Sequence, residues 1–419
     1  MAGTVTGGAF LFDAVRTPWG RGRVDGALRG VKPVSLVAGL VDELRKRNPT
    51  LDVDRLGDLL LGVAIPARDQ GGDLARAAAL VAGLPDTVGG AVVSRLGASG
   101  LDAIALAAAR VGAGWDDLLL AGGVEAMSRV PPGADAGPLA SDPATNHRTG
   151  FIPAGVAADL LATLTGLSRD DLDGYALRSR RLAAQAWAEG RLARTVVPVH
   201  DHGLPVLDHE ERLGPVEAGI SVEASRLDAA ASHLAGLPAA FAQAGEQAGF
   251  DAVATRTYHW LERVEHAHTA GSSAGPADGA ALVLVGGAWA ADELGLTPRA
   301  RVTHVARAGS DPTLALGGAT AATRALLARA GHDVADIDLF ETDEAYAAVA
   351  LAYQRALAIP AEKLNVNGGA VAVGHPLGAT GARLVATAVD ELERRGARRA
   401  VVAVSAGAGM GVATLLERV

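Results

Sequence analysis

The feature that most constrains the fold is one strand-and-helix pattern that occurs near both ends of the chain. Residues 114–127 read GWDDLLLAGGVEAM, and residues 396–410 read GARRAVVAVSAGAGM. Residues 53–62 (VDRLGDLLLG) and 334–343 (VADIDLFETD) are similar in the same way. In each segment, charged residues precede an apolar strand pattern that ends in small residues. We therefore predict two related halves, built from a duplicated βα domain.

Strand and helix patterns also alternate within the first half. Strands are predicted at residues 9–15 (AFLFDAV) and 58–65 (DLLLGVAI), and helices at 33–47 (PVSLVAGLVDELRKR) and 73–84 (DLARAAALVAGL). This alternation predicts an α/β fold, in which helices cover a sheet. The 419 residues exceed what one ordinary core holds, so we expect two or three domains.

The composition changes between about residues 128 and 265, where Pro, Gly, Asp and Ser are frequent. Residues 168–192 predict a pair of amphipathic helices, and Ser168 with Asp171 makes a capped helix start. We read this region as an inserted, largely helical loop domain, and long insertions usually serve binding. The predicted domains are an N-terminal domain of residues 1–127 plus 266–289, a loop domain of residues 128–265 and a C-terminal domain of residues 290–419.

Several function classes are disfavoured by composition. The net charge is −9 and the basic runs are short, which argues against nucleic-acid binding. No apolar stretch approaches the ~20 residues of a membrane span, and the first residues lack the order of a signal peptide, so we expect a cytoplasmic protein. The chain has no cysteine, which excludes disulfides, zinc–thiolate sites and thiol nucleophiles. The 11 histidines show no metal-ligand pattern, and residues 201–211 (DHGLPVLDHEE) read as a polar loop.

Residues 94–103, SRLGASGLDA, form a predicted strand-to-helix turn. A turn of this kind aims a side chain and several free backbone N–H groups at one point, and enzymes often place a nucleophile there. Gly97 occupies that position and has no side chain. The residues alone leave three readings open: an active site, a former one, or only a tight turn.

The segment richest in candidate chemistry is NVNGGAVAVGHPLGATGARL, residues 365–384. The letters AVAV predict a short strand, His375 follows it, and Pro376 keeps the histidine backbone extended. Gly378 and Gly381 open a helix, whose positive end favours a neutral imidazole able to exchange a proton near pH 7. The alternative is a glycine-rich turn with a structural histidine.

Residues 340–353 (FETDEAYAAVALAY) predict a strand that turns into an alanine-rich helix. Asp343 and Glu344 are predicted in the first turn of that helix, where acids suit the helix dipole. They are either functional groups or helix caps.

Two weaker candidates are also strand-associated glycine turns. Residues 404–413 (VSAGAGMGVA) carry Ser405 as the one polar side chain, and residues 268–285 carry Ser272, Ser273 and Asp278.

Taken together, these segments resemble the thiolase family, in particular the acetyl-CoA C-acyltransferases of bacterial fatty-acid oxidation. NVNGGAVAVGHPLGATGAR is close to verbatim, and GVEAMSRVP, YHWLERVEHAHTAG and DLDGYALRS support it. The resemblance implies a thiolase fold of duplicated αβαβα layers with a loop domain inserted in the N-terminal half. It also implies a homodimer or dimer of dimers, and coenzyme A or acyl-CoA as substrate or ligand with no tightly bound cofactor.

The family's mechanism implies four side-chain positions, and three of them are changed here. A nucleophilic cysteine in C-x-S-G-L matches Gly97, and a second cysteine in C-x-G-G-G matches Ser405, with Ala408 interrupting the glycines. The asparagine of N-E-A-F matches Asp343, and only the histidine of GHP is kept, as His375. Without a side chain at residue 97 no acyl-enzyme forms, so the two-step covalent route is closed.

Other parts of the family's site are retained in sequence. The backbone N–H groups of Gly97 and Gly407 match an oxyanion hole, and the resemblance implies a coenzyme A surface that includes Ser272, Gly374 and Gly409. Ser272 stands where relatives carry asparagine in GNSSG.

Two main functions follow from this mixture. One is a diverged enzyme that binds acyl-CoA and does other chemistry such as retro-aldol cleavage, with His375 as base or acid and Ser405, Asp343 or Tyr346 assisting. The other is a catalytically silent thiolase-like subunit, or an acyl-CoA-binding partner of an active acyl-CoA enzyme. A weaker third is a slow hydrolase or acyltransferase that uses water or Ser405. Ordinary thiolase activity is not expected.

Overall fold

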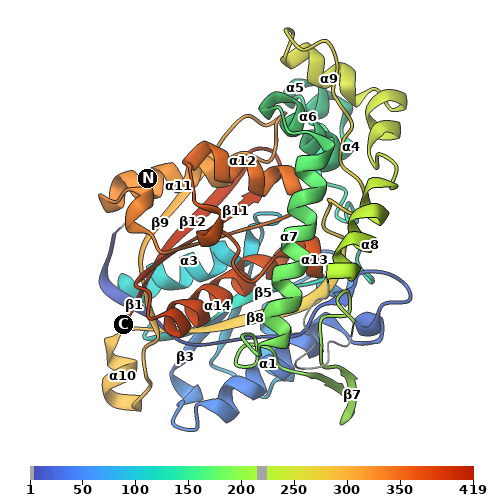
Figure 1. Ribbon diagram of the computed structural model, residues 1–419. Coiled ribbons are helices and arrows are strands. Elements are labelled where there is room, and N and C mark those ends of the chain that lie inside the picture. The colour runs from blue at the N-terminus through green and yellow to red at the C-terminus, as the bar shows by residue number, and fades with distance from the viewer. Residues whose placement is uncertain (1–3, 215–223) are drawn as a thin grey trace.

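The computed structural model describes residues 4–214 and 224–419 of the chain. Within these residues, ten strands join in one sheet with the order β10-β11-β12-β9-β1-β8-β5-β3-β4, and β2 (Gly20–Arg21) pairs with β8 off this path (Figure 1). Two of these strands, β1 and β9, pair antiparallel at the centre of the order. They divide the sheet into two half-sheets.

The first half-sheet runs β1-β8-β5-β3-β4. The β1–β8 and β8–β5 pairs are antiparallel, and the β5–β3 and β3–β4 pairs are parallel. Its strands are β1 (Thr4–Arg16), β8 (Ala277–Gly286), β5 (Leu118–Ala126), β3 (Leu56–Gly62) and β4 (Gly89–Val93).

The second half-sheet repeats the order and directions of the first four strands of the first half-sheet. It runs β9-β12-β11-β10, again with two antiparallel pairs followed by a parallel one. A single parallel bridge between Phe340 and Leu364 occupies the place that β4 takes in the first half. Its strands are β9 (Ala300–Gly309), β12 (Met410–Arg418), β11 (Arg399–Ala406) and β10 (Leu339–Thr342). The predicted duplication is thus seen in the strand order.

Helices form three layers around the two half-sheets. The outer helices of the first half are α1 (Pro33–Arg47) and α2 (Leu74–Val81), and those of the second are α11 (Gly318–Ala330) and α12 (Ala347–Leu357). Between the half-sheets lie α3 (Ser99–Gly112) and α14 (Leu377–Arg395), which pack on each other and on strands of both halves (Figure 1). The layers are therefore αβαβα, as the resemblance implied.

The two central helices approach most closely at their first turns. A Cβ atom added to Gly100 would lie 2.3 Å from the carbonyl oxygen of Gly378. Only glycine allows this approach, and it brings the turns that precede α3 and α14 side by side.

Most of the remaining helices lie in the chain between β5 and β8, and Figure 1 shows them gathered beside the layered body. They are α4 (Pro138–Ser141), α5 (Pro143–Thr149), α6 (Ala154–Thr165), α7 (Arg169–Ala188), α8 (Ala224–Ala235) and α9 (Phe250–Thr257). The hairpin of β6 (Val199–Asp201) and β7 (Leu204–Leu207) lies in the same stretch, and α10 (Ala288–Leu294) follows β8.

The insertion is helical as predicted, with differences in detail. The expected helix pair at residues 168–192 is one 20-residue helix, α7, because it continues through Gly174 and no proline interrupts it. Ser168 and Asp171 form the predicted capping box at its start. The segment read as a polar loop contains the β6–β7 hairpin and then Glu210, which is buried and pairs with Arg16 at 2.6 Å.

Two predictions of local structure near the candidate site segments were wrong. The AVAV segment is a short helix, α13 (Ala370–Val373), because Gly369 and Gly374 bound it and its N–H groups bond back to Gly369 and Ala370. Helix α12 begins at Ala347, so Asp343 and Glu344 lie in the loop before it and not in its first turn.

In the described residues, no single helix is long and apolar enough to cross a membrane, although one bent pair, Pro143–Thr165 with Arg169–Ala188, passes by length and composition. The same residues contain no group of three or more His, Asp and Glu side chains placed to hold a metal ion.

Candidate active site

The site lies where four segments meet: the turn before α3, the turn before α14, and the ends of β10 and β11. These segments carry Gly97, His375, Asp343 and Ser405 respectively. Three of the four come from the second half of the chain.

Gly97 has room for a side chain. An added Cβ atom would lie 3.4 Å from the Ser405 carbonyl oxygen, 3.8 Å from His375 Nε2 and 3.9 Å from Leu377 Cδ2, which are ordinary contacts. A side chain here would therefore point at the histidine. The turn is held open by Ser99, whose hydroxyl donates to the Leu96 carbonyl at 2.6 Å and accepts from the Arg95 N–H at 2.8 Å.

His375 has its tautomer fixed by Thr380. The Thr380 hydroxyl donates its proton to the Pro376 carbonyl at 3.0 Å, so it accepts from His375 Nδ1–H at 2.7 Å. Nε2 then carries the lone pair, and it is this atom that faces the empty position at Gly97. Burial, with a smaller contribution from the Arg383 charge, lowers the pKa of His375 to about 4, so the imidazole is neutral at pH 7.

Ser405 points its hydroxyl away from the histidine. Its Oγ donates to the Leu316 carbonyl at 2.9 Å and accepts from the Ala319 N–H at 3.1 Å, at the start of α11. The Ser405 atom that lies nearest to the space at Gly97 is the carbonyl oxygen. In this arrangement the hydroxyl proton is engaged by a backbone acceptor.

Asp343 lies directly behind Ser405 and is 1% exposed. Its Oδ1 accepts from the Ser405 N–H at 2.7 Å, whereas Oδ2 is buried and has no hydrogen-bond partner among the described residues. Burial raises the pKa of Asp343 to about 7, against the lowering effect of the Ser405 N–H.

Glu344 anchors the loop that carries Asp343. Its carboxylate accepts from the hydroxyls of Tyr175 (2.8 Å) and Ser179 (2.6 Å), both on α7, and from Asn365 Nδ2 (2.9 Å). This polar contact ties the end of β10 to the inserted helices.

Tyr346, the other candidate in this loop, packs its ring against His268 and Phe241, with centroids 5.7 and 5.6 Å apart. Burial raises the pKa of Tyr346 to about 12. The phenol therefore keeps its proton at pH 7.

Two positioning residues were not anticipated from sequence. One is Thr380, which lies one turn into α14 and five residues after His375. That spacing could have indicated a hydrogen bond to the histidine. The other is Glu125 at the end of β5, whose Oε2 accepts from the N–H groups of Gly378 and Ala64 at 2.9 Å each. Glu125 thus fixes the first turn of α14 beside His375; nothing in its sequence context indicated this.

The glycine and serine candidates for ligand binding are placed differently. In the described part of the chain, the N–H groups of Gly97 and Gly407 have no protein acceptor. Gly374, at φ +103°, adjoins His375, whereas Gly409 has both backbone groups bonded to residues 310–315. Ser272 is fully buried, and its hydroxyl accepts from the Thr269 N–H at 3.0 Å.

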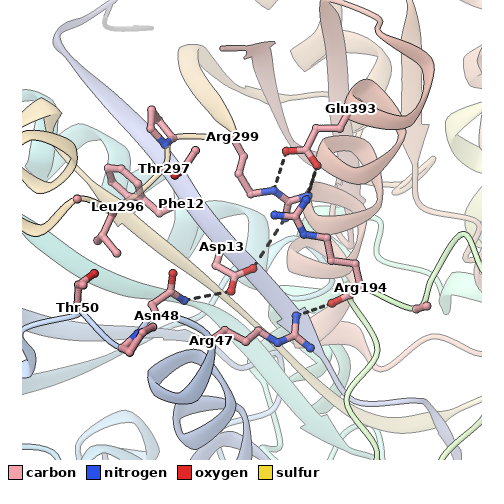
Figure 2. A pocket seen from close by; sticks show the side chains of 14 residues that line it. Phe12, Asp13, Arg47, Asn48, Thr50, Arg194, Leu296, Thr297, Arg299 and Glu393 are labelled. Carbon is pink, nitrogen blue, oxygen red and sulfur yellow. Dashed lines mark hydrogen bonds and ion pairs between the residues drawn. The ribbon is translucent and has the colours of Figure 1, made fainter.

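A pocket of about 780 Å³ lies at the far end of α14 from this site (Figure 2). Arg299 pairs there with Asp390 and Glu393 at 2.6 Å each, and Arg194 pairs with Glu393 at 2.8 Å. Because these cations already have acidic partners, the pocket offers no free charge for catalysis. Its other lining residues include Phe12, Asp13, Arg47, Asn48, Thr50, Leu296 and Thr297.

Comparison with known proteins gives concordant results along the whole chain. The thiolase N-terminal domain family matches residues 9–251, and the thiolase C-terminal domain family matches residues 296–418. A beta-ketoadipyl-CoA thiolase of Escherichia coli is 38% identical over 98% of this chain and 99% of its own length. A 3-ketoacyl-CoA thiolase of Colwellia psychrerythraea is 34% identical, with the same coverage.

A solved structure is similar over its full length as well. The acetyl-CoA acetyltransferase of Bacillus anthracis matches with a TM-score of 0.81 and 32% identity, covering 100% of both chains. The αβαβα layers, the matched domains and these relatives lead to one conclusion: the chain belongs to the thiolase family.

Proposed function

We propose that the protein binds acyl-CoA thioesters and cleaves or forms a carbon–carbon bond in them without a covalent acyl-enzyme. The observation that carries this is the empty position at Gly97, where an added Cβ atom would lie 3.8 Å from the unprotonated Nε2 of a neutral His375. A family member with a base and no nucleophile is suited to proton transfer rather than acyl transfer.

Retro-aldol cleavage of a β-hydroxyacyl-CoA fits these groups. His375 Nε2 removes the proton of the β-hydroxyl, the Cα–Cβ bond breaks, and the β-carbon leaves as an aldehyde or ketone. The electron pair moves to the thioester as an enolate, which accepts hydrogen bonds from the N–H groups of Gly97 and Gly407. The histidinium then protonates the α-carbon, which releases the shortened acyl-CoA and restores the neutral imidazole.

The choice of substrate class is supported by the relatives. Their names describe thiolases of beta-ketoadipyl-CoA and 3-ketoacyl-CoA, and an acetyl-CoA acetyltransferase. A coenzyme A thioester is the part common to these substrates, so we carry over that part alone.

One observation favours the second candidate, a silent subunit that binds acyl-CoA beside an active enzyme. The Ser405 hydroxyl donates its proton to the Leu316 carbonyl, so the residue in place of the second cysteine does not offer a base to the site. Under either function we also propose a homodimer or dimer of dimers in the cytoplasm, with the domain limits given above.

The test is an assay of the purified wild-type protein with 3-ketoacyl-CoA plus coenzyme A, and separately with β-hydroxyacyl-CoA. We expect no thiolysis, and release of an aldehyde or ketone from the second substrate. A triple variant, Gly97→Cys with Ser405→Cys and Asp343→Asn, should gain measurable thiolysis, because the space at residue 97 already accepts a Cβ atom beside the histidine.

The outcomes separate the candidates. Thiolysis by the wild type, or an acyl adduct on the wild-type chain, refutes the proposal. Acyl-CoA binding without turnover, together with co-purification of another acyl-CoA enzyme, favours the silent subunit. His375→Gln is the matched control. This variant should lower the rate of cleavage about 10²–10⁴-fold and leave acyl-CoA binding in place.

A further inference from the structure

We propose that His266 is a doubly protonated imidazolium that fastens α9 to α6, and that loss of one proton at alkaline pH releases residues 243–257 from the rest of the insertion. We call the three side chains involved, Asp159 of α6, His266 and Asp251 of α9, the histidine clasp. The clasp lies among the inserted helices, so its action does not depend on the reaction proposed above.

Both ring nitrogens of His266 face carboxylate oxygens. Nδ1 lies 2.8 Å from Asp159 Oδ2, and Nε2 lies 3.0 Å from Asp251 Oδ2. An ionised carboxylate only accepts hydrogen bonds, and a neutral imidazole has a single N–H to donate. The two contacts are therefore hydrogen bonds at the same time only when His266 carries a proton on each nitrogen.

His268, two residues along the chain, shows the opposite arrangement. Its Nδ1–H also donates to Asp159, at 2.8 Å to Oδ1, but its Nε2 accepts from the backbone N–H of Ala348 at 3.3 Å. That nitrogen must keep its lone pair, so His268 is neutral here. The two histidines share one carboxylate and differ because the second nitrogen of His266 meets another carboxylate, whereas that of His268 meets an N–H group.

Asp159 is suited to hold both rings. Its Oδ1 accepts from the backbone N–H groups of Ala267 and His268, at 3.2 and 2.9 Å, as well as from the His268 ring. The Asp159 side chain is fully buried and receives only donors, as an ionised carboxylate does. The strand-like stretch that contains the two histidines is thus fixed to α6 from both its backbone and its side chains.

The charges around His266 favour the cation. Burial opposes a charge on the ring, but the hydrogen bonds and negative charges of Asp159 and Asp251 outweigh it and raise the pKa of His266. Among the described residues, no other carboxylate lies within ion-pair distance of this ring. From the loop before α12, Tyr346 acts on the same cluster through Asp159, and with a pKa of about 12 its phenol stays neutral.

The segment that the clasp holds has few buried side chains of its own. Among residues 243–257, only Gly245 and Ala254 are buried. Gly245 lies in a π-helical turn, Gln243–Gln247, that rests directly on the clasp: a Cβ atom added there would lie 2.5 Å from His266 Cε1. A segment with so little buried apolar surface has low local stability, so one charge-assisted hydrogen bond is a large part of what holds it.

The same segment borders the candidate active site through Phe241. The Phe241 ring packs edge-on against Tyr346, with centroids 5.6 Å apart, and Tyr346 belongs to the loop that carries Asp343. His268 holds the start of α12 through Ala348 without any charge. Release of the clasp therefore removes support from one side of this loop and leaves the other side in place.

The direction of the pH effect follows from the raised pKa. A histidine with a higher pKa in the folded state stabilises the fold fully below its unfolded value of about 6.5, and this contribution is lost as the pH rises through the folded value. The proton lost is the one on Nε2, because Asp251 is 23% exposed and can turn to water, whereas Asp159 is fully buried.

The first measurement is nuclear magnetic resonance of the wild-type protein with ¹⁵N-labelled histidine, in which the His266→Gln spectrum assigns the signals. At pH 6 we expect both ring nitrogens of His266 to be protonated. The titration midpoint should lie above about 6.5, the value of an unperturbed histidine. A single protonated nitrogen at pH 6, or a midpoint below that of a free histidine, overturns the clasp.

The second measurement is amide hydrogen exchange between pH 6 and 9, compared as protection factors so that base catalysis of exchange cancels. Residues 243–257 of the wild type should lose about tenfold in protection over this range. Asp251→Asn should be independent of pH, because the amide can accept from an imidazolium or donate to a neutral ring. His147→Gln is the matched control. His147 contacts α9 through Arg256 at 3.0 Å but not through a carboxylate, so this variant should follow the wild type.

The outcomes are decisive in either direction. A loss of protection confined to residues 243–257 and absent in Asp251→Asn supports the clasp. An equal loss in the wild type and Asp251→Asn overturns it, and so does a loss shared equally by α6 and α12, because that pattern reports general unfolding. The wild-type ring signals decide the protonation state even if a variant fails to fold.

Discussion

The ends of the two half-sheets use equivalent positions in opposite ways. In the repeated segments, Gly62 on β3 corresponds to Asp343 after β10, and Gly123 on β5 corresponds to Ser405 on β11. The first half has no side chains at these points, and the second half has two buried polar ones. The two halves of the duplicated framework therefore contribute unequally to the candidate site.

The first half is closed by packing. A Cβ atom on Gly62 would lie 2.3 Å from the Gly100 N atom, and one on Gly123 would lie 2.0 Å from the Gly378 carbonyl oxygen. The first turns of α3 and α14 thus rest directly on the ends of β3 and β5, and Glu125 bonds to the Gly378 N–H there. At the end of the second half-sheet, by contrast, there is room for a side chain at Gly97. His375 faces Gly97 across this space.

The largest effect should come from filling the closed side. Gly123→Ala places a methyl group within 2.0 Å of a backbone oxygen, so we expect a loss of about 3 kcal/mol or more in the free energy of unfolding. Gly97→Ala is the matched control on the open side and should change the free energy of unfolding by less than about 0.5 kcal/mol. Urea denaturation of both variants checks this, and equal losses would contradict the asymmetry.

A smaller effect should appear in the pH dependence of stability on the open side. The folded pKa of Asp343 is about 7, above the unfolded value of about 3.9, so the folded state holds the extra proton. Wild-type stability should therefore fall as the pH rises from about 4 to 7. Asp343→Asn lacks this titration and should gain about 2.5 kcal/mol relative to the wild type between pH 5 and 7.

Thermal or urea unfolding of both proteins at these two pH values measures the difference. A constant gap between them would show that Asp343 does not change its proton affinity on folding.

The smallest effect concerns the tautomer of His375. Thr380→Val removes the acceptor of Nδ1–H and should slow the proposed cleavage about tenfold without weakening acyl-CoA binding. Thr380→Ser keeps the hydroxyl and should retain the rate. If valine and serine behave alike, the hydrogen bond does not orient the base.

Much of the fold could be predicted from sequence because helices and strands follow from the local spacing of apolar residues. The helix predicted at residues 33–47 has those bounds in the structure, and the repeated segments predicted the matching half-sheets. The AVAV segment failed for a physical reason, since four apolar residues between glycines have no period that separates a buried strand from a helical turn.

Sequence also predicted which residues make up the candidate site, but not the directions in which their side chains point. Sequence identified Gly97, His375, Asp343 and Ser405, and the structure brings them to one region. That Ser405 turns its hydroxyl to α11, and that Glu125 supports α14, depend on contacts between residues 86 and 253 positions apart. Local patterns carry no information on such pairs.

The open position opposite His375 has a practical consequence. Family members with a cysteine at this point are expected to be inhibited by thiol-alkylating agents, whereas this chain has no thiol for such reagents to attack. The proposed cleavage by the purified protein should therefore survive treatment with iodoacetamide, whereas thiolysis by a contaminating cysteine-dependent thiolase should be lost.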